Sequence, residues 1–516
     1  MTNNFFITSP IYYVNDIPHI GHAYTSIACD TIARFHRLKN HQVFFLTGTD
    51  EHGQKVEKSA TNQQKNPQQF CDEVSQKFRD LANLLNLSND DFIRTTEARH
   101  QKTVAKIWEI LQKNGYIYKD IYEGWYAVRD EAFYNADEIV DGKAPTGAEV
   151  SWHREESYFF RLSAFQDKLL ALYEAVPDFI RPVSRYNEVV NFVKSGLKDL
   201  SISRTSFTWG IKVPNDEKHV VYVWLDALFN YISALDFANN SSENPAKLFQ
   251  NFWNNATNSP IHIVGKDIVR FHAVYWPAFL MASNINVPFG VFAHGWWTNE
   301  GQKISKSVGN VIDPIKEIDW LKSFNLSHET AIDYFRYFLM REVPFGNDGD
   351  YSRTHLIVRL NSELVNNIGN LTQRCLTMIY KNCEGKIPEG VEHSQTHIEP
   401  FIENYFLAID NLAIDKAIQS IIEFSDFVNK KFNDLAPWNL KKQGKIAEMN
   451  ICLHETAESI RLIAILLLPF VPHCANKILD LLNIYNNHRN FNFIAKKIIA
   501  GQNILEPVAI FPRLNS

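Results

Sequence analysis

Cysteine is scarce in this chain and is not arranged to form a disulfide framework. The six cysteines are scattered over 516 residues, and no two of them are spaced as Cys-x-x-Cys. They are Cys29, Cys71, Cys375, Cys383, Cys452 and Cys474. This pattern excludes a small disulfide-bonded scaffold and is typical of a protein from a reducing compartment.

Long apolar runs are also missing. The most apolar stretch, Leu462 to Val471, has about half of the ~20 residues that a transmembrane helix needs, and Pro469 interrupts it. The N-terminus lacks the basic region and the apolar segment of a secretory signal. We therefore expect a cytoplasmic protein that has no membrane partner.

The chain has no excess of positive charge, because its formal net charge is −6. This balance excludes a protein that coats nucleic acid over its whole surface, but a local basic strip could still bind RNA. There is no internal repeat and no low-complexity tract, which excludes repeat architectures. The length and a hydrophobic content of 45% predict about two to four globular domains.

The N-terminal segment alternates between strand and helix patterns. Phe5–Ile7 and Gln42–Leu46 are short apolar runs typical of buried strands, and residues 19–38 between them carry apolar side chains at helical spacing. This alternation predicts an α/β fold with a doubly wound parallel sheet. Ligands of such sheets bind at the carboxyl ends of the strands.

The residue pattern changes twice in the rest of the chain. Residues 117–212 are rich in aromatic residues, Glu and Gly, which predicts an insertion of short antiparallel strands. Strand-like runs return at Val220–Trp224, Ile261–Val264 and Val287–Phe292, so the insertion splits the α/β domain. After residue 355 the pattern is helical. The predicted boundaries are 1–116, 117–212, 213–297, 298–355 and 356–516.

The first chemical motif is Pro18-His19-Ile20-Gly21-His22, at the start of the predicted helix. Main-chain N–H groups and the dipole at a helix start favour an anion, and the two histidines, three apart, lie on one side of the helix. They could donate hydrogen bonds to phosphate, while Gly21 allows a close approach. The alternative is a pair of helix-start histidines with no ligand.

The second motif is Lys303-Ile304-Ser305-Lys306-Ser307, which follows a strand-like run and a turn at Gly301. Its lysines and serines make a loop rich in hydrogen-bond donors that could hold a triphosphate during a reaction. The alternative is a solvated basic loop. Together the two motifs resemble the HIGH and KMSKS signatures of class I aminoacyl-tRNA synthetases, with Ile304 in place of the usual methionine.

Longer blocks resemble methionyl-tRNA synthetases in particular, over nearly the whole chain. They are Ser9–Asn15, Leu46–Gly53, Val223–Ala227, Gly265–His272, Trp276–Ala278, His294–Trp296 and Leu435–Trp438. The resemblance is to the short bacterial form without a C-terminal dimerisation domain. It implies a Rossmann-like catalytic domain split by a connective insertion, a KMSKS-loop and stem-contact region at 298–355, and an all-α helical-bundle anticodon-binding domain at 356–516.

The same resemblance assigns the site residues. The methionine-binding set is Ile11, Tyr13, Asp50, Trp224, Ala227, Tyr231, Ile268, His272 and Trp276. Asp50 is expected to bind the ammonium group, and aromatic rings suit a polarizable thioether. For each aromatic residue alone, plain core packing is the alternative.

ATP with Mg²⁺ is the expected cofactor. The ATP-binding set is His19, Gly21, His22, Gly265, Asp267, Lys303, Ser305, Lys306 and Ser307. Of these, His19, His22, Lys303 and Lys306 are expected to be catalytic. They would position the phosphates and stabilise developing charge while the methionine carboxylate attacks the α-phosphate.

Recognition of the tRNA(Met) anticodon is assigned to Asn370, Arg374 and Trp438. An aromatic ring among lysines can stack on an unpaired base. The alternative is a surface polar pair beside a packed tryptophan. The tRNA acceptor end would receive the methionyl group at its terminal adenosine.

The chain departs from many family members in lacking the thiolates of a zinc knuckle. No cysteine lies between Cys71 and Cys375, so we predict no metal site and no zinc. We expect the insertion to be held by aromatic packing around Trp125, Tyr126, Phe133 and Tyr134. Because the sequence ends at Ser516 without the dimerising domain of longer relatives, we also expect a monomer.

Three other interpretations remain open at this stage. The first is a class I synthetase for another amino acid. Cysteinyl enzymes, however, depend on zinc, and the isoleucyl, valyl and leucyl enzymes usually carry a larger insertion. The second is an RNA-binding protein that has lost catalysis, and the third is a small-molecule nucleotidyltransferase. Both signatures and Asp50 are intact, which argues against the second, and the long helical segment argues against the third.

Overall fold

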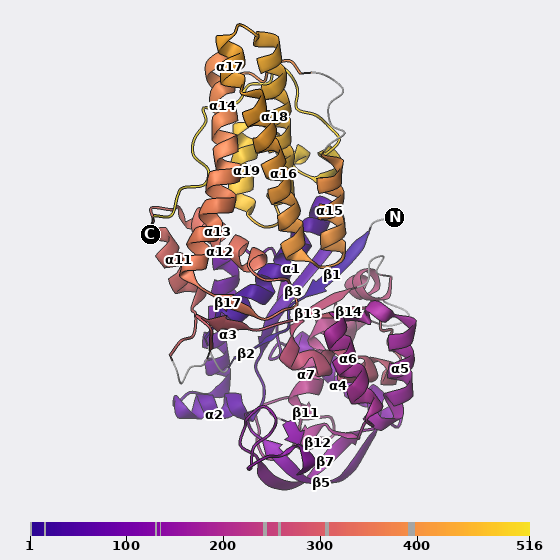
Figure 1. Ribbon diagram of the computed structural model, residues 1–516. Helices are drawn as coiled ribbons and strands as arrows, with labels where there is room; N and C mark the ends of the chain where they lie inside the picture. Colours follow the sequence, from indigo (N-terminus) through magenta and orange to yellow (C-terminus); the bar gives the residue numbers. More distant parts are fainter. Residues whose placement is uncertain are drawn as a thin grey trace. The chain divides into compact units, whose positions relative to one another are not determined.

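The computed structural model describes residues 3–14, 17–129, 132–134, 136–240, 245–255, 260–304, 309–390 and 398–515. The chain divides into two compact units, each built from separate segments (Figure 1). The first unit contains residues 1–18, 42–83 and 89–294, and the second contains residues 19–41, 84–88 and 295–516. This division differs from the predicted domain boundaries, which remain predictions.

The first unit is built on a seven-stranded sheet in which every pairing is parallel. The strand order is β2-β3-β1-β13-β14-β8, and β4 pairs with β3. The strands are β1 (Asn4–Thr8), β2 (Tyr12–Tyr13), β3 (Gln42–Asp50), β4 (Asp91–Arg94), β8 (Ile180–Arg181), β13 (Ile261–Gly265) and β14 (Gly290–His294). Strand β1 is buried along its whole length, as a parallel strand covered on both faces should be. The predicted parallel α/β sheet is confirmed.

Helices of the first unit connect these strands and carry much of its core. They are α2 (Gln54–Asn62), α3 (Pro67–Leu84), α4 (Ala98–Lys113), α5 (Gln166–Ala175), α6 (Val183–Lys194), α7 (Val223–Leu228), α8 (Asn230–Ser233), α9 (Lys247–Phe249) and α10 (Trp276–Ala282). The predicted strand over Val220–Trp224 is wrong in its last residues, because α7 begins at Val223. A tertiary contact explains the difference, since the buried Asp226 in this helix is held by two histidines from other elements.

The insertion consists of antiparallel sheets, as predicted. A four-stranded sheet has the order β6-β5-β7-β9, and a three-stranded sheet has the order β10-β12-β11. The strands are β5 (Ile117–Ala127), β6 (Ala132–Tyr134), β7 (Ser151–Phe160), β9 (Leu200–Ser201), β10 (Ser203–Arg204), β11 (Lys212–Val213) and β12 (Asp216–Val221). Antiparallel pairing therefore continues past residue 212 to Val221.

The second unit contains helix α1 (Ile20–Leu38), a small sheet and the helical C-terminal half of the chain. The sheet has the order β16-β15-β17, from β15 (Trp297–Asn299), β16 (Gln302–Lys303) and β17 (Gly349–Tyr351). The later helices are α11 (Pro314–Lys322), α12 (His328–Arg341), α13 (Arg353–Leu360), α14 (Asn370–Asn382), α15 (Glu399–Asp410), α16 (Ile414–Leu435), α17 (Pro437–Lys442), α18 (Ile446–Leu467) and α19 (Pro472–Leu481).

Long helices pack side by side in this unit, with α18 lying against α14, α16 and α19 (Figure 1). A buried ion pair between Arg336 and Asp30, with 2.6 Å between nitrogen and oxygen, joins α12 to α1. The predicted helical C-terminal region is confirmed. In the part of the chain that the structure describes, no helix is long and apolar enough to cross a membrane.

Candidate functional site

Six of the nine residues assigned to methionine belong to one extended hydrophobic cluster of the first unit or pack against it. Tyr231 and Trp276 belong to its buried core, and four partly buried side chains pack against it. These four are Ile11, Tyr13, Trp224 and Ile268. Ala227 is buried in α7, one turn after Trp224. The methionine-binding role of the set stays a prediction, but the fold does place these six side chains in the same core.

A hydrogen-bonded pair, Tyr231 and His272, supplies the polar atoms of this cluster. Nδ1 of His272 lies 3.0 Å from the carbonyl oxygen of Ile268, so this nitrogen carries the proton and donates. Nε2 must then accept, and the Tyr231 hydroxyl donates to it over 2.7 Å. Burial lowers the pKa of His272 to about 4, so the imidazole is neutral at pH 7.

A second buried histidine, His262, was not predicted and lies against the Tyr231 ring, with 4.2 Å between the ring centroids. The indole N–H of Trp276 donates to Nε2 of His262 over 3.3 Å, and Nδ1–H then donates to the Thr8 hydroxyl over 2.8 Å. Burial, and next the neighbouring His272, hold the pKa of His262 well below its ordinary value. The sequence showed His262 only as part of a strand, so the contact could not be foreseen.

Trp224 lies flat on another ring, Phe271. The ring centroids are 3.6 Å apart and the planes differ by 5°. Stacking fixes the orientation of the partly buried indole, which also meets His272 edge to face at 6.4 Å. Phe271 was not predicted as a site residue, although it lies within the Gly265–His272 block.

Asp226 links helix α7 to the chain that follows β3. Its carboxylate accepts from Nδ1 of His52 and from Nε2 of His100, each over 2.6 Å. Burial favours the neutral acid, but the two imidazoles outweigh it and hold the pKa of Asp226 below its ordinary value. The helix that carries Trp224 is thus anchored close to the end of β3, where Asp50 lies.

Asp50 is the last residue of β3 and is 7% exposed. Its main chain pairs with Tyr13 of β2, so two residues of the predicted methionine set are neighbours in the sheet. Gly265 ends β13, and Asp267 follows in a short turn with its side chain exposed. A Cβ atom at residue 265 would lie 2.5 Å from a carboxylate oxygen of Asp267, so glycine leaves the room that this carboxylate needs.

The histidine motif opens helix α1 in the second unit. Nδ1 of His19 accepts from the N–H of Gly21, and Nδ1 of His22 accepts from the N–H of His19, both over 3.1 Å. The protons of both neutral rings therefore lie on Nε2, which makes each ring a donor. The ring centroids are 3.9 Å apart, and burial, with His19 as the smaller cause, holds the pKa of His22 well below its ordinary value.

The lysine motif begins at Lys303, the last residue of β16, which pairs with Thr298 of β15. Ser305, Lys306 and Ser307 lie outside the described residues. Just beyond the loop, the carbonyl oxygen of Ile312 accepts from the N–H of Ile20 over 3.0 Å. The chain that leaves the lysine loop is therefore bonded to the helix start that carries the histidines.

Two of the three residues assigned to the anticodon, Arg374 and Trp438, are in contact on the helical bundle. The guanidinium carbon of Arg374, in α14, lies 5.0 Å from the ring centroid of Trp438, in α17. Nη2 of Arg374 also donates to Asn433 over 2.9 Å, which orients the guanidinium group. Asn370 is exposed one turn earlier on α14. The cluster offers a cation, an amide and a partly exposed aromatic ring.

Comparison with known proteins places this geometry in a family. The family model for class I tRNA synthetases (M) matches residues 5–150 and 146–376. A methionine–tRNA ligase of Rickettsia conorii is 55% identical over 525 residues, covering 99% of this chain and 100% of the relative. That of Brucella suis is 48% identical over 521 residues, covering 99% and 98%. This chain belongs to the methionyl-tRNA synthetases of class I.

Solved structures of the family share the fold along the whole length. The Mycobacterium tuberculosis methionyl-tRNA synthetase in complex with methionyl-adenylate superposes with a TM-score of 0.92 and 42% identity. The match covers 99% of this chain and 100% of that one. The free form of the same protein gives a TM-score of 0.86 at 40% identity.

We predicted that the insertion contains no zinc, and the structure describes most of the residues of that region. Among the described residues, no three His, Cys, Asp or Glu side chains form a group that could hold a metal ion. The interior near the turn between β6 and β7 contains three alanines, Ala127, Ala144 and Ala148, with Tyr134 packed on them. Tyr126 is buried, Trp125 meets Trp152 edge to face at 5.4 Å, and the side chain of Phe133 lies outside the described part.

Proposed function

We propose that this chain is a methionine–tRNA ligase. It activates L-methionine with ATP to methionyl adenylate and transfers the methionyl group to the 3′-terminal adenosine of tRNA(Met), releasing AMP and diphosphate. The observation that carries the proposal is the Tyr231–His272 pair, which is neutral and contacts the rings of Trp276 and Trp224. Such surroundings suit an unbranched thioether, which is a weak hydrogen-bond partner.

Substrate recognition divides between the two ends of methionine. The thioether would lie among Tyr13, Trp224, Trp276 and the Tyr231–His272 pair, where sulfur–aromatic contacts add to burial. The buried carboxylate of Asp50 would accept hydrogen bonds from the ammonium group, and charge assistance makes such bonds strong. Ile11, Ala227 and Ile268 would complete the apolar lining.

Activation needs no protein nucleophile. The methionine carboxylate attacks the α-phosphate of ATP, a bond to the bridging oxygen breaks, and diphosphate leaves. His19 and His22 would donate from Nε2 to phosphate oxygens, and Lys303 and Lys306 would stabilise the charge that develops on diphosphate. Gly21, Ser305 and Ser307 would add donors to the phosphates, while Gly265 and Asp267 would hold the ribose. Mg²⁺ bound with ATP would neutralise part of the phosphate charge.

Recognition of tRNA would use the helical bundle. Arg374 lies over Trp438, so an unpaired anticodon base could stack on this pair while Asn370 reads its edge. We also propose that the protein acts as a monomer in the cytoplasm, where tRNA is charged for translation. A sedimentation measurement that gives the mass of two chains would contradict the monomer.

A charging assay tests the proposed function directly. Total tRNA, ATP and Mg²⁺ are incubated with the protein and each labelled amino acid in separate reactions. We expect acid-stable label on tRNA with methionine alone, and digestion of the charged RNA should release methionyl-adenosine. Charging with another amino acid, or none with any, would contradict the proposal.

A further inference from the structure

Glu51, the residue next to Asp50, has a carboxylate with no exposure to solvent. A buried carboxylate is costly unless hydrogen bonds replace its water. Here each oxygen accepts two. Oε1 accepts from the Thr49 hydroxyl over 2.7 Å and from Nε of Arg94 over 2.6 Å. Oε2 accepts from Nη2 of Arg94 over 2.9 Å and from the Thr96 hydroxyl over 2.6 Å.

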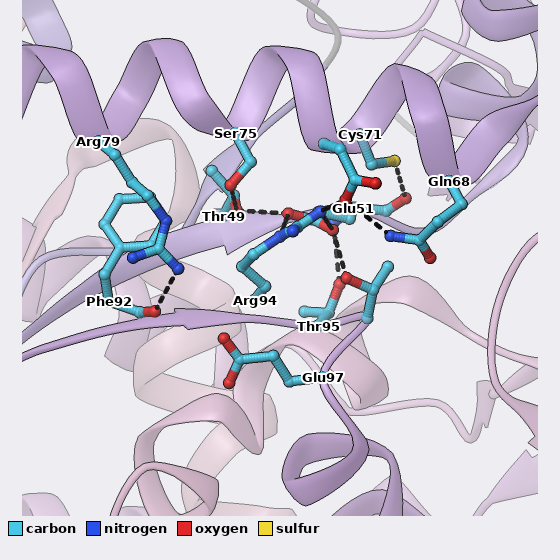
Figure 2. Close-up of polar contacts among 12 residues, drawn as sticks. Thr49, Glu51, Gln68, Cys71, Ser75, Arg79, Phe92, Arg94, Thr95 and Glu97 are labelled. Carbon is cyan, nitrogen blue, oxygen red and sulfur yellow. Dashed lines mark hydrogen bonds and ion pairs between the residues drawn. The ribbon is translucent and has the colours of Figure 1, made fainter. Parts of the chain in front are cut away.

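Arg94, the last residue of β4, joins this carboxylate to a helix. Figure 2 shows the side chains of Glu51, Thr49 and Arg94 converging beside α3, which carries Ser75 and Cys71. Nη2 of Arg94 also donates to Asp72 of α3 over 2.5 Å. Burial lowers the pKa of Arg94, but the hydrogen bonds and attraction of Glu51 outweigh it and raise the pKa above its ordinary value. The guanidinium group is therefore a permanent cation between two carboxylates.

The main chain of Glu51 is held as firmly as its side chain. Its N–H donates to the Thr95 hydroxyl over 2.9 Å. Its carbonyl oxygen accepts from the Trp209 indole over 2.5 Å and from the Cys71 thiol over 3.3 Å. All the polar atoms of Glu51 thus have partners, which is the arrangement expected where the position of a residue matters.

The strand leading to Asp50 is fixed on both sides. Thr49 pairs with Tyr12 of β2 and with Arg94 of β4, so a strand lies on each of its edges. Strand β4 comes so close that a Cβ atom at Gly48 would lie 2.0 Å from the carbonyl oxygen of Ile93. Beyond Thr49, the carbonyl oxygen of Asp50 accepts from the N–H of Val14 over 3.1 Å. Glu51 comes directly after this fixed strand end, so its own contacts hold the chain on the far side of Asp50.

We propose that Glu51 is a positioning residue: its bonds to Arg94 fix the main chain next to Asp50 and so keep the Asp50 carboxylate where it receives the ammonium group of the substrate. This inference rests on the proposed function, in which Asp50 binds that group. Because its carboxylate is fully buried and bonded within the protein, Glu51 has no proposed contact with the substrate.

The test uses the variant Glu51→Gln, which removes the negative charge of the side chain but keeps its size and shape. Methionine-dependent ATP–pyrophosphate exchange gives KM for methionine and for ATP. Two inhibitors separate the ends of the substrate: methioninol keeps the ammonium group and lacks the carboxylate, and 4-(methylthio)butanoate lacks the ammonium group. A melting curve measures folding.

The matched control is Glu458→Gln in α18 of the second unit. Glu458 is also buried and accepts two hydrogen bonds from Arg461, over 2.8 and 2.6 Å. Glu458 has no proposed role in substrate binding or catalysis. This variant therefore measures how the loss of a buried ion pair alone changes the stability and the kinetic constants of the protein.

For Glu51→Gln we expect KM for methionine and Ki for methioninol to rise about tenfold, the scale of one weakened charge-assisted bond. KM for ATP and Ki for 4-(methylthio)butanoate should stay within about twofold of wild type, as should all four constants in the control. Equal rises for both inhibitors, or unchanged methionine constants, would overturn the positioning role. The wild-type protein is measured first, and a lack of methionine-dependent exchange would contradict the proposed function. If the wild type is active and the Glu51→Gln variant is unaffected, only the positioning role of Glu51 is contradicted.

Discussion

At the residue scale, the polar groups proposed to meet the thioether are uncharged. The Tyr231 hydroxyl donates to a neutral His272, whose pKa burial lowers to about 4 from 6.5. Because the folded-state pKa lies below the unfolded value, stability from the neutral ring is present above pH 6.5 and is lost as the pH falls toward 4. Over the usual assay range, the hydrogen bond keeps its direction.

This neutrality predicts a flat pH dependence. Between pH 5.5 and 8, KM for methionine should vary by no more than about twofold, because His272 stays unprotonated. The control Tyr231→Phe loses the bond at every pH, so its KM should be raised by about 2- to 12-fold and be equally flat. Initial-rate exchange assays at several pH values measure both proteins. A KM that climbs tenfold from pH 7.5 to 5.5 in wild type would show that the ring titrates there.

Lys306 belongs to the loop proposed to stabilise the charge on diphosphate. Lys306→Ala should reduce the maximal rate of exchange by about 10²-fold or more, the usual scale for losing a transition-state donor. Lys316→Ala, which removes an exposed lysine of α11, should leave the rate unchanged. A Lys306→Ala rate within a few-fold of wild type would refute the role.

Site residues could be predicted where a block of sequence resembles the family. Side-chain contacts between separate strands and helices could not be predicted. The block Leu46–Gly53 contained Asp50, but nothing in it indicates that Glu51 bonds to Arg94 of a later strand. Likewise Phe271 stacks on Trp224 and His262 supports Trp276 only because separate segments cross. Such contacts depend on tertiary packing, which spacing along the chain does not encode.

At the element scale, periodicity predicted strands and helices wherever the local pattern was strong. The run Phe5–Ile7 lies in β1, and the pattern over residues 19–38 became α1 with His19 as its N-cap. The pattern failed at Val223, where apolar residues typical of a strand form helix α7 instead. The anchoring of Asp226 by His52 and His100 overrides local propensity there.

Helices α14 and α17 form the element pair proposed to read the anticodon. Trp438→Ala should abolish or strongly reduce charging of tRNA while methionine-dependent exchange without tRNA remains at the wild-type rate, because α17 belongs to the helical bundle and contributes nothing to methionine binding. Trp438→Phe, which keeps a ring under Arg374, should retain most of the charging. Equal losses of charging and exchange would make Trp438 a structural residue.

At the scale of the whole molecule, the insertion is predicted to hold its shape without zinc. Elemental analysis of the purified protein should give much less than one zinc per chain, and extended EDTA treatment should leave the melting temperature unchanged. The physical reason is that the sequence between Cys71 and Cys375 offers no thiolate, and the described interior there is apolar. One tightly held zinc per chain would contradict the prediction.

The central claim is that this chain selects methionine for activation, and ATP–pyrophosphate exchange tests it most directly. The protein is stripped with EDTA, resupplied with Mg²⁺ alone and assayed with each standard amino acid in turn. Exchange with methionine and with no other amino acid is the predicted result. Exchange with a different amino acid would contradict the assignment of the Tyr231–His272 cluster, and no exchange with any, even after tRNA is added, would contradict catalysis itself.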